Sequence, residues 1–194
     1  MLTLYYAPGA CSMAAHIVLE ESGEKYQPQK MDLAKGDQKQ PDYLKIHPMG
    51  RVPALTLDNG ESLTENTAIL PYLGKRFNVW PADPMAEARA HSLIGFLAAS
   101  VHPAHAHFNR PERYSADPAA FPAIKEQGLK SFHGYLKELD GKLAGKEWFG
   151  DKYSVLDPYG LVFYVWGVRR GLPMADLKNF TAFEDRMAKL EAVG

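Results

Sequence analysis

Cysteine is nearly absent from this 194-residue sequence, since Cys11 is the only one. A single cysteine cannot form an internal disulfide, which excludes a small disulfide-stabilised domain and fits a reducing compartment such as the cytoplasm. Long apolar runs are absent as well. The longest, at 161–168, is far shorter than the ~20 residues that a membrane-spanning helix requires. The N-terminus has no basic, apolar leader, so we expect no signal peptide.

The sequence also lacks an excess of either charge. It has 22 Lys and Arg residues against 23 Asp and Glu residues, and its formal net charge is −1. Binding to a phosphate backbone or to an anionic membrane surface needs a basic patch. We therefore expect neither nucleic acid nor a membrane as a partner. Apolar residues make up 46% of the chain, which is typical of one large or two small globular domains.

The N-terminal residues indicate a β-α-β unit. Residues 2–6 are rich in strand-forming side chains, and the Pro-Gly pair at 8–9 marks a turn after them. The run that begins at Ser12 favours a helix, and Gly23 is a typical stop signal at its end. Residues 26–33 are a second candidate strand. A strand-helix-strand crossover of this kind implies that the two strands pair in parallel.

A hairpin and another helix follow a polar stretch at 34–50, which we interpret as a loop. The strand candidates 53–57 and 62–65 flank the sequence Asp-Asn-Gly, a strong signal for a tight antiparallel hairpin. Residues 65–77 carry apolar side chains at helical spacing, although Pro71 should interrupt or kink a helix there.

No strand pattern returns in the remainder of the chain. The segment 79–85 is polar and contains two prolines, so we place a linker there, between one domain at 1–78 and an all-helical one at 86–194. Two runs of apolar residues recur at steps of three and four and predict amphipathic helices: Leu129, Phe132, Leu136, Leu139 and Leu143, then Phe180, Phe183, Met187 and Leu190. Residues 161–166 are apolar on all sides and predict the central helix of a bundle.

A capping box marks the start of that central helix. Its sequence is Ser-Val-Leu-Asp at 154–157, with Asp in place of the usual Glu or Gln. We expect the Ser154 hydroxyl to accept from the N–H of Asp157, and the Asp157 carboxylate to accept from the N–H of Ser154. The box stabilises the start of the helix by about 1 kcal/mol in typical cases.

Cys11 stands directly after the first turn and directly before the first predicted helix. A free thiol with a pKa near ~8.5 is only ~3% ionised at pH 7, whereas the unpaired N–H groups of a helix N-terminus stabilise an anion. We therefore expect a lowered pKa and a reactive thiolate at Cys11. The alternative is a small buried apolar side chain, which is a common role for a lone cysteine.

Five short motifs are spread along the chain: YYAPGACS at 5–12, GRVPAL at 50–55, LTEN at 63–66, RP at 110–111 and SVLDPY at 154–159. In combination they resemble the bacterial beta-class glutathione S-transferases, and the resemblance covers most of the chain. It implies the glutathione S-transferase fold, in which an α/β thioredoxin-like N-terminal domain binds glutathione and an all-α helical bundle follows.

The resemblance also implies three catalytic residues. Cys11 matches a cysteine that contacts the sulfur of glutathione and can form a mixed disulfide with it. Tyr6 matches a tyrosine that holds the glutathione thiolate in related classes, although a tyrosine on a strand can equally be a core residue. His102 matches a histidine of the helical domain that faces the sulfur. A metal at His102, His105 and His107 is an alternative, but acidic or thiol partners are missing and we expect none.

Six residues are implied in glutathione binding: Lys35, Arg51, Val52, Pro53, Glu65 and Asn66. The backbone of Val52 would pair with the cysteinyl part of glutathione like an added strand, next to a cis peptide bond at Pro53. Glu65 would contact the γ-glutamyl amine, while Asn66 and the helix N-terminus would bind the γ-glutamyl carboxylate. Glu65 could instead be a plain first-turn acid. The glycyl carboxylate would meet Lys35, with Lys39 and Arg51 as alternatives.

The function implied is that of a cytoplasmic homodimeric detoxification enzyme. It would use glutathione as co-substrate, without a metal, and would transfer the glutathione thiolate to small hydrophobic electrophiles. Two other functions stay open at this point. One is a glutathione-dependent thiol transferase or reductase in which Cys11 carries a mixed disulfide, and the other is a non-catalytic binding protein on the same fold.

Overall fold

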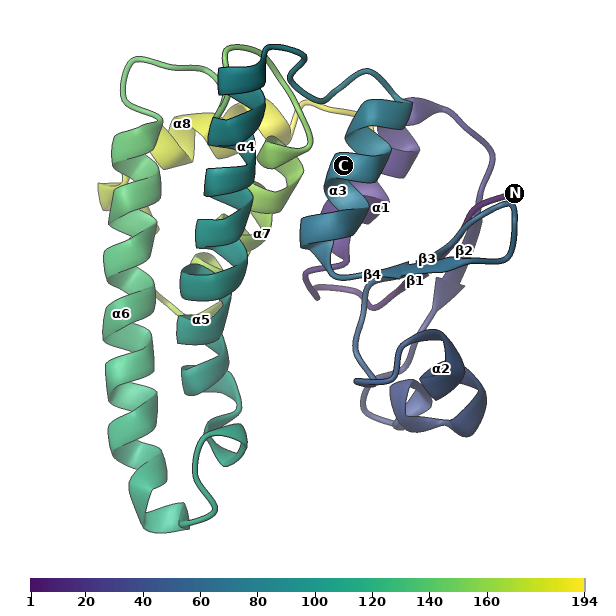
Figure 1. Ribbon diagram of the computed structural model, residues 1–194. Helices are drawn as coiled ribbons and strands as arrows, with labels where there is room; N and C mark the ends of the chain where they lie inside the picture. The colour runs from purple at the N-terminus through teal and green to yellow at the C-terminus, as the bar shows by residue number, and fades with distance from the viewer. Residues whose placement is uncertain (194) are drawn as a thin grey trace.

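The computed structural model describes residues 1–193, and in it the chain forms two parts that lie side by side (Figure 1). One part is built around a small sheet, and the other contains only helices. Within residues 1–193 no helix has the length and hydropathy that crossing a membrane would require. The division of the chain into two parts agrees with the fold class expected from the sequence.

The sheet has four strands in the order β2-β1-β3-β4. They are β1 (Thr3–Tyr6), β2 (Gln27–Lys30), β3 (Ala54–Thr56) and β4 (Ser62–Thr64). Strands β1 and β2 pair in parallel, whereas β1–β3 and β3–β4 are antiparallel. The predicted β-α-β unit and the predicted hairpin are therefore both confirmed.

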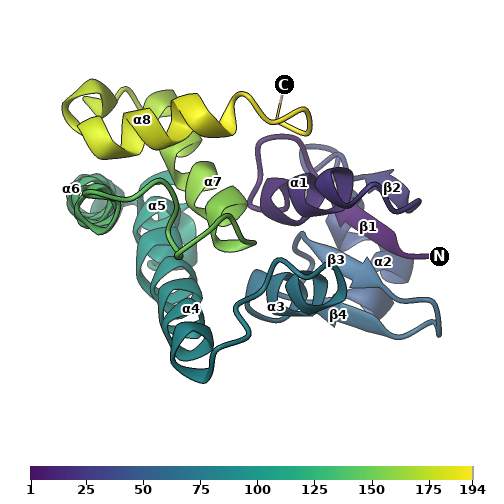
Figure 2. The ribbon, with the colours of Figure 1, turned by 90° about the horizontal axis from the view of Figure 1, so that it is seen from above.

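Helices α1 (Met13–Ser22) and α3 (Asn66–Arg76) cover the face of the sheet that points toward the all-helical part (Figure 2). Helix α1 ends at Gly23, whose φ of 66° is the left-handed conformation that glycine adopts readily, so the predicted stop signal is confirmed. Helix α3 runs through Pro71 without interruption. Its apolar side is fully buried against the sheet and α1.

The stretch 34–50 is not a simple loop, which corrects our interpretation of it. It contains a 3₁₀ turn at Asp37–Lys39 and the short helix α2 (Pro41–Ile46). Six residues span fewer than two helical turns, so α2 has too few apolar positions to show a helical period in the sequence. Tyr43 of α2 is buried and packs the segment 34–50 against the sheet.

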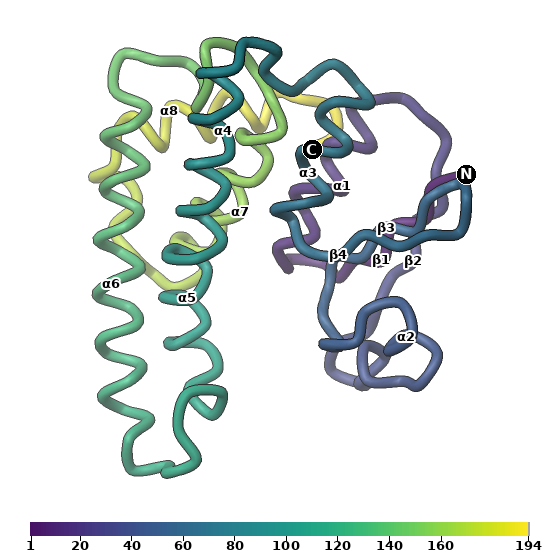
Figure 3. Tube along the Cα trace, in the orientation of Figure 1, coloured from purple at the N-terminus to yellow at the C-terminus, as the bar shows by residue number. Residues whose placement is uncertain are grey.

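The second part consists of α4 (Pro84–Phe96), α5 (His102–Asn109), α6 (Phe121–Lys142), α7 (Leu156–Arg169) and α8 (Lys178–Met187). A π-helical segment, Leu97–Val101, joins α4 to α5, so the two form one long rod beside α6 (Figure 3). Helix α7 lies between this pair and α1, and nearly all of its side chains are buried. The prediction of a central helix is confirmed. The exact boundaries of the two domains stay a prediction.

The capping box before α7 forms in part. As predicted, the Asp157 carboxylate accepts from the N–H of Ser154 at 2.8 Å, and it also accepts from the N–H of Phe149 at 2.9 Å. The Ser154 hydroxyl accepts from Leu156 at 3.3 Å and not from Asp157, because the N–H of Asp157 bonds to the Ser154 carbonyl. The fully buried Asp157 thus fixes both the start of α7 and the preceding loop.

Candidate active site

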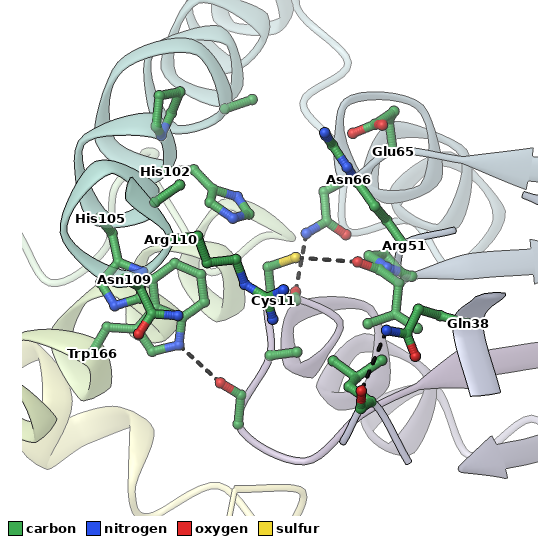
Figure 4. A pocket seen from close by; sticks show the side chains of 18 of the residues that line it. Cys11, Gln38, Arg51, Glu65, Asn66, His102, His105, Asn109, Arg110 and Trp166 are labelled. Carbon is green, nitrogen blue, oxygen red and sulfur yellow. Dashed lines mark hydrogen bonds between the residues drawn. The ribbon is translucent and has the colours of Figure 1, made fainter. Parts of the chain in front are cut away.

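A pocket of about 510 Å³ lies between the two parts of the molecule (Figure 4). On the sheet side it is lined by the loop that carries Cys11, by the segment 50–53 and by the first residues of α3. On the helical side it is lined by α5, by the connection that follows α5, and by α7. Segments more than a hundred residues apart in the sequence therefore form one site.

The loop that carries Cys11 is fixed by hydrogen bonds within the loop and by a hydrogen bond from the all-helical part of the chain. The buried Ser12 hydroxyl donates to the Ala7 carbonyl at 3.2 Å and accepts from the Ala7 N–H at 3.1 Å, which closes the turn. The indole N–H of Trp166, on α7, donates to the Gly9 carbonyl at 2.9 Å (Figure 4). The position of Cys11 therefore depends on how the two parts pack together.

The thiol of Cys11 is half-buried and donates to the carbonyl of Val52, with 3.4 Å between the sulfur and the oxygen. Burial raises the pKa of Cys11 to about 12, and the nearby Glu65 carboxylate adds to the effect. The backbone N–H groups of Cys11 and Ser12 and the Arg51 guanidinium act in the opposite direction without offsetting it. Our expectation of a lowered pKa is therefore wrong for this structure, because desolvation outweighs the helix N-terminus.

The segment 50–53 lines the pocket beside this thiol. The peptide bond between Val52 and Pro53 is cis, which confirms the conformation implied by the resemblance. Among residues 1–193 the N–H of Val52 has no hydrogen-bond partner, so it is free to pair with an extended ligand. Arg51 is exposed at the rim of the pocket.

Glu65 and Asn66 stand together where α3 begins. Glu65 has a φ of 69°, a left-handed conformation that is unusual for a residue other than glycine and that often marks functional positions. No basic side chain within residues 1–193 forms an ion pair with Glu65.

The side chain of Asn66 is buried and ties α3 to the cysteine loop. Its amide donates to the Cys11 carbonyl at 3.0 Å (Figure 4). The carbonyl oxygen of the same side chain has no partner in the described part of the chain. We expected this side chain to donate to a ligand carboxylate, but its bond to Cys11 engages the amide group. The atom left for a ligand is an acceptor.

Two of the three histidines of α5 share one aromatic neighbour, and the third lies apart from them. His102 lines the pocket and packs edge-on against Trp166, with ring centres 5.1 Å apart. His105 is stacked on Trp166 and accepts from Arg170 at 3.2 Å. His107 is stacked on Tyr114 outside this group. Within residues 1–193 no cluster of three or more His, Cys, Asp or Glu side chains could hold a metal ion.

Burial, together with the positive charges of Arg51 and Arg113, lowers the pKa of His102 to about 4. The imidazole is therefore neutral at physiological pH. A neutral imidazole has one N–H donor and one acceptor nitrogen, so it can hydrogen-bond a ligand without contributing a charge.

The structure does not bring Tyr6 or Lys35 into this pocket. The ring of Tyr6 packs against His16 of α1, with ring centres 4.4 Å apart. Lys35 is exposed and forms an ion pair with Asp32 at 3.4 Å. Of the three basic residues that we predicted for a ligand carboxylate, Arg51 lines the pocket, and Lys35 and Lys39 do not.

Several lining residues were missed by the sequence analysis. Tyr159 is buried beside Cys11, and burial raises the pKa of its hydroxyl. The others are arginines on the helical side, Arg110, Arg113, Arg169 and Arg170. The motifs SVLDPY and RP include Tyr159 and Arg110, but their spacing alone does not show that either residue faces Cys11.

Comparison with known proteins agrees with this geometry. Residues 1–75 match the family model described as glutathione S-transferase, N-terminal domain. The chain is 31% identical over 199 residues to glutathione S-transferase GstA of Escherichia coli O157:H7, and the match covers 97% of this chain and 93% of that protein.

Two solved structures are similar over nearly the whole length. A glutathione transferase homologue from Sulfitobacter with bound glutathione superposes with a TM-score of 0.94 at 34% identity, covering 100% of this chain and 95% of that one. A bacterial beta-class glutathione S-transferase of Sphingomonas chungbukensis superposes with a TM-score of 0.87 at 34% identity, covering 99% and 95% respectively.

Proposed function

Since the chain belongs to the glutathione S-transferase family, we propose that it is a glutathione transferase whose catalytic centre is the pocket around Cys11. One observation carries the proposal. Among residues 1–193, one wall of the pocket gathers a thiol, a carboxylate without an ion-pair partner, a backbone N–H without a hydrogen-bond partner and a helix N-terminus, and the opposite wall carries apolar, aromatic and arginine side chains. These groups match the chemistry of glutathione.

The groups of glutathione can be matched to the sheet side one at a time. Glu65 and the free side-chain oxygen of Asn66 suit the γ-glutamyl ammonium, which is a cation with N–H donors. The N–H groups at the start of α3 suit the γ-glutamyl carboxylate. Val52 offers backbone pairing to the cysteinyl part, and Arg51 suits the glycyl carboxylate.

Cys11 acts in this proposal as a hydrogen-bond donor. Its raised pKa of about 12 keeps the proton on the sulfur at neutral pH. A protonated thiol can turn from the Val52 carbonyl toward the sulfur of bound glutathione and stabilise the thiolate, which lowers the pKa of the substrate. That thiolate then attacks the electrophilic carbon of the second substrate.

His102 lies on the opposite wall and completes this environment. Because its imidazole is neutral, it can donate its N–H to the glutathione sulfur directly or through a water molecule. Tyr159 stays protonated as well and is a further donor next to Cys11. The proposed mechanism thus uses neutral donors in a partly desolvated pocket, and no cationic partner for the sulfur is required.

Thiol transfer through a Cys11 mixed disulfide is the second candidate. It needs Cys11 as a thiolate nucleophile or leaving group, and the raised pKa of this thiol disfavours both roles. A non-catalytic binding protein is the third. Mass spectrometry under non-reducing conditions tests the second candidate, because thiol transfer requires a glutathione adduct on Cys11 and the absence of this adduct during turnover would exclude it.

The test compares Cys11→Ser and Cys11→Ala with the unmodified chain. Conjugation rates with 1-chloro-2,4-dinitrobenzene report the chemistry, and calorimetric titration with glutathione reports affinity. We expect Cys11→Ala to reduce kcat about 10-fold or more with little change in affinity, and Cys11→Ser to retain more activity because a hydroxyl also donates. A larger loss of affinity than of turnover would contradict the assigned role.

We also propose the remaining features implied by the resemblance. These are a homodimer, two domains at 1–78 and 86–194, and a cytoplasmic location, which the lone cysteine favours. Light scattering after gel filtration tests the dimer. A single species at the mass of one 21.6 kDa chain would contradict it.

A further inference from the structure

The helical side of the pocket carries more positive charge than glutathione needs. The residues that line the whole pocket include five arginines, and Glu65 is the only acidic one among them. The chain as a whole has a net charge of −1. The excess of positive charge is therefore a local property of this pocket.

Two of the five arginines have structural partners. Arg170 donates to His105 at 3.2 Å and to Asn109 at 2.7 Å. Arg169 donates to the Gly9 carbonyl at 3.4 Å and packs over this glycine so closely that a Cβ there would lie 2.1 Å from the guanidinium. Their positions are explained by the packing of α7 against the cysteine loop.

No contact of this kind explains the positions of the other three arginines, Arg51, Arg110 and Arg113. Within residues 1–193 none of the three guanidinium groups forms an ion pair or a hydrogen bond with a carboxylate. Arg110 follows α5 and extends from the helical side into the pocket, toward the wall that holds Cys11 (Figure 4). Three like charges that share one pocket repel each other, so an anion placed among them would be stabilised.

The positive charges of these side chains lower the pKa values of two groups in the pocket, Arg113 and His102. Burial lowers the pKa of Arg113, and the charges of Arg110 and then Arg51 lower it further. Arg51 and Arg113 also lower the pKa of His102. Arg51 and Arg113 therefore create a positive potential at His102, and Arg110 adds to the positive potential at Arg113.

Glutathione accounts for one of these three charges. Its γ-glutamyl carboxylate has the N-terminus of α3, and its glycyl carboxylate has Arg51, which leaves Arg110 and Arg113 on the opposite wall. The same side of the pocket also has apolar or aromatic lining residues, including Pro103, Ala106 and Tyr114. This wall suits a molecule with an apolar body and an acidic end.

We propose that the second substrate of this enzyme is a small electrophile that carries a carboxylate, and that Arg110 and Arg113 bind this carboxylate. The inference rests on the proposed glutathione transferase function and adds the substrate class to it. Guanidinium groups bind carboxylates in bidentate geometry, so the two arginines also orient the electrophilic carbon toward the glutathione sulfur. The expected substrate is therefore an anion with an apolar body, which narrows the small hydrophobic electrophile that we predicted from the sequence.

The reaction on such a substrate balances without a further reagent. For an aryl chloride, the glutathione thiolate forms the carbon–sulfur bond and the carbon–chlorine bond breaks. Chloride leaves with the bonding electron pair, and the proton of the glutathione thiol passes to solvent. The carboxylate takes no part in the chemistry and stays bound to its arginines.

The experiment uses two probes that differ in one group, 4-chloro-3-nitrobenzoate and 4-chloro-3-nitrobenzamide. Each enzymatic rate is divided by the uncatalysed rate with glutathione at the same pH. We expect the normalised kcat/KM of the unmodified enzyme to be about 10-fold higher for the benzoate. Arg110→Gln or Arg113→Gln should remove most of this preference by raising the KM for the benzoate, because each variant loses one charged contact with the carboxylate.

Arg89→Gln is the matched control, because Arg89 is an exposed arginine of α4 that does not line this pocket. It removes the same charge from the chain and should leave the benzoate preference unchanged. Raising the ionic strength from about 0.05 M to about 0.5 M should weaken the preference in the unmodified enzyme and in Arg89→Gln, which both keep the two pocket arginines. Equal normalised rates for the two probes, or equal effects of Arg110→Gln and Arg89→Gln, would overturn the proposal.

A carboxylate could also reach these arginines on a second glutathione unit, as in glutathione disulfide. Inhibition by glutathione disulfide is therefore measured for the same variants. If Arg110→Gln and Arg113→Gln weaken this inhibition but leave the benzoate preference intact, the arginines serve the disulfide and the electrophile proposal is wrong. If the unmodified enzyme conjugates 1-chloro-2,4-dinitrobenzene but neither probe, the substrate-class proposal is wrong. If it conjugates none of the three, the proposed transferase function fails.

Discussion

The ionisation of Cys11 can be tested directly, because this residue provides the only thiol in the chain. In the folded protein burial raises its pKa from 9.0 to about 12. At pH 8 the thiolate fraction is then about 10⁻⁴, against about 10⁻¹ for a thiol with the reference value, a difference of about 1,000-fold. A thiolate with a higher pKa is also a stronger nucleophile. For a Brønsted slope of about 0.4–0.5, the rise of the pKa from 9.0 to about 12 makes the Cys11 thiolate about 15- to 30-fold more reactive, which offsets part of its lower abundance.

The expected result is that iodoacetamide alkylates folded Cys11 about 30- to 60-fold more slowly than the urea-unfolded chain at pH 8. The rate should keep rising tenfold per pH unit to pH 10 without a plateau. Intact-mass spectrometry measures the single adduct, and far-UV circular dichroism confirms that the protein stays folded. A plateau below pH 9 in the folded protein would refute the argument that desolvation controls this thiol.

Glu65→Gln provides a second measurement on the same thiol. The Glu65 carboxylate raises the pKa of Cys11, so removing its charge should lower this pKa and speed alkylation. Glu61→Gln makes the same chemical change at an exposed position of the β3–β4 hairpin and should leave the alkylation rate unaltered. Equal rates for the two variants would show that Glu65 does not act on the sulfur.

Two further predictions concern stability and pH. Asp157→Ala leaves two buried N–H groups without an acceptor and should reduce the free energy of unfolding by about 2–5 kcal/mol. Urea denaturation at pH 8 measures this, and a loss below about 1 kcal/mol would contradict it. Burial lowers the pKa of His102 to about 4, so the pH profile of conjugation from 5 to 8 should have the same shape in His102→Gln. Because this pKa is below the unfolded value of 6.5, the contribution of His102 to stability is lost as the pH falls from about 6.5 through 4.

The fold was largely predictable because its signals are local. The hairpin, the stop at Gly23 and the amphipathic helices each depend on residues close together in sequence, whose turn chemistry and periodicity act over one or two turns. Helix α2 was missed for the same reason, since it is too short to show a period. The bond between Asp157 and Ser154 was predicted, whereas the additional bond to Phe149 depends on the path of the preceding loop.

The sequence by itself determined the order of the elements and the positions of the motifs, and its motifs identified Cys11, Glu65 and Asn66 as residues of one site. Only the tertiary structure decided how that site behaves. The packing of the two parts around the thiol desolvates it and reverses the expected direction of its pKa shift. The same packing brings Arg110 and Arg113 opposite Arg51 and leaves Tyr6 outside the pocket. Desolvation and charge–charge interactions depend on distances between atoms in space, and neither can be obtained from distances along the chain.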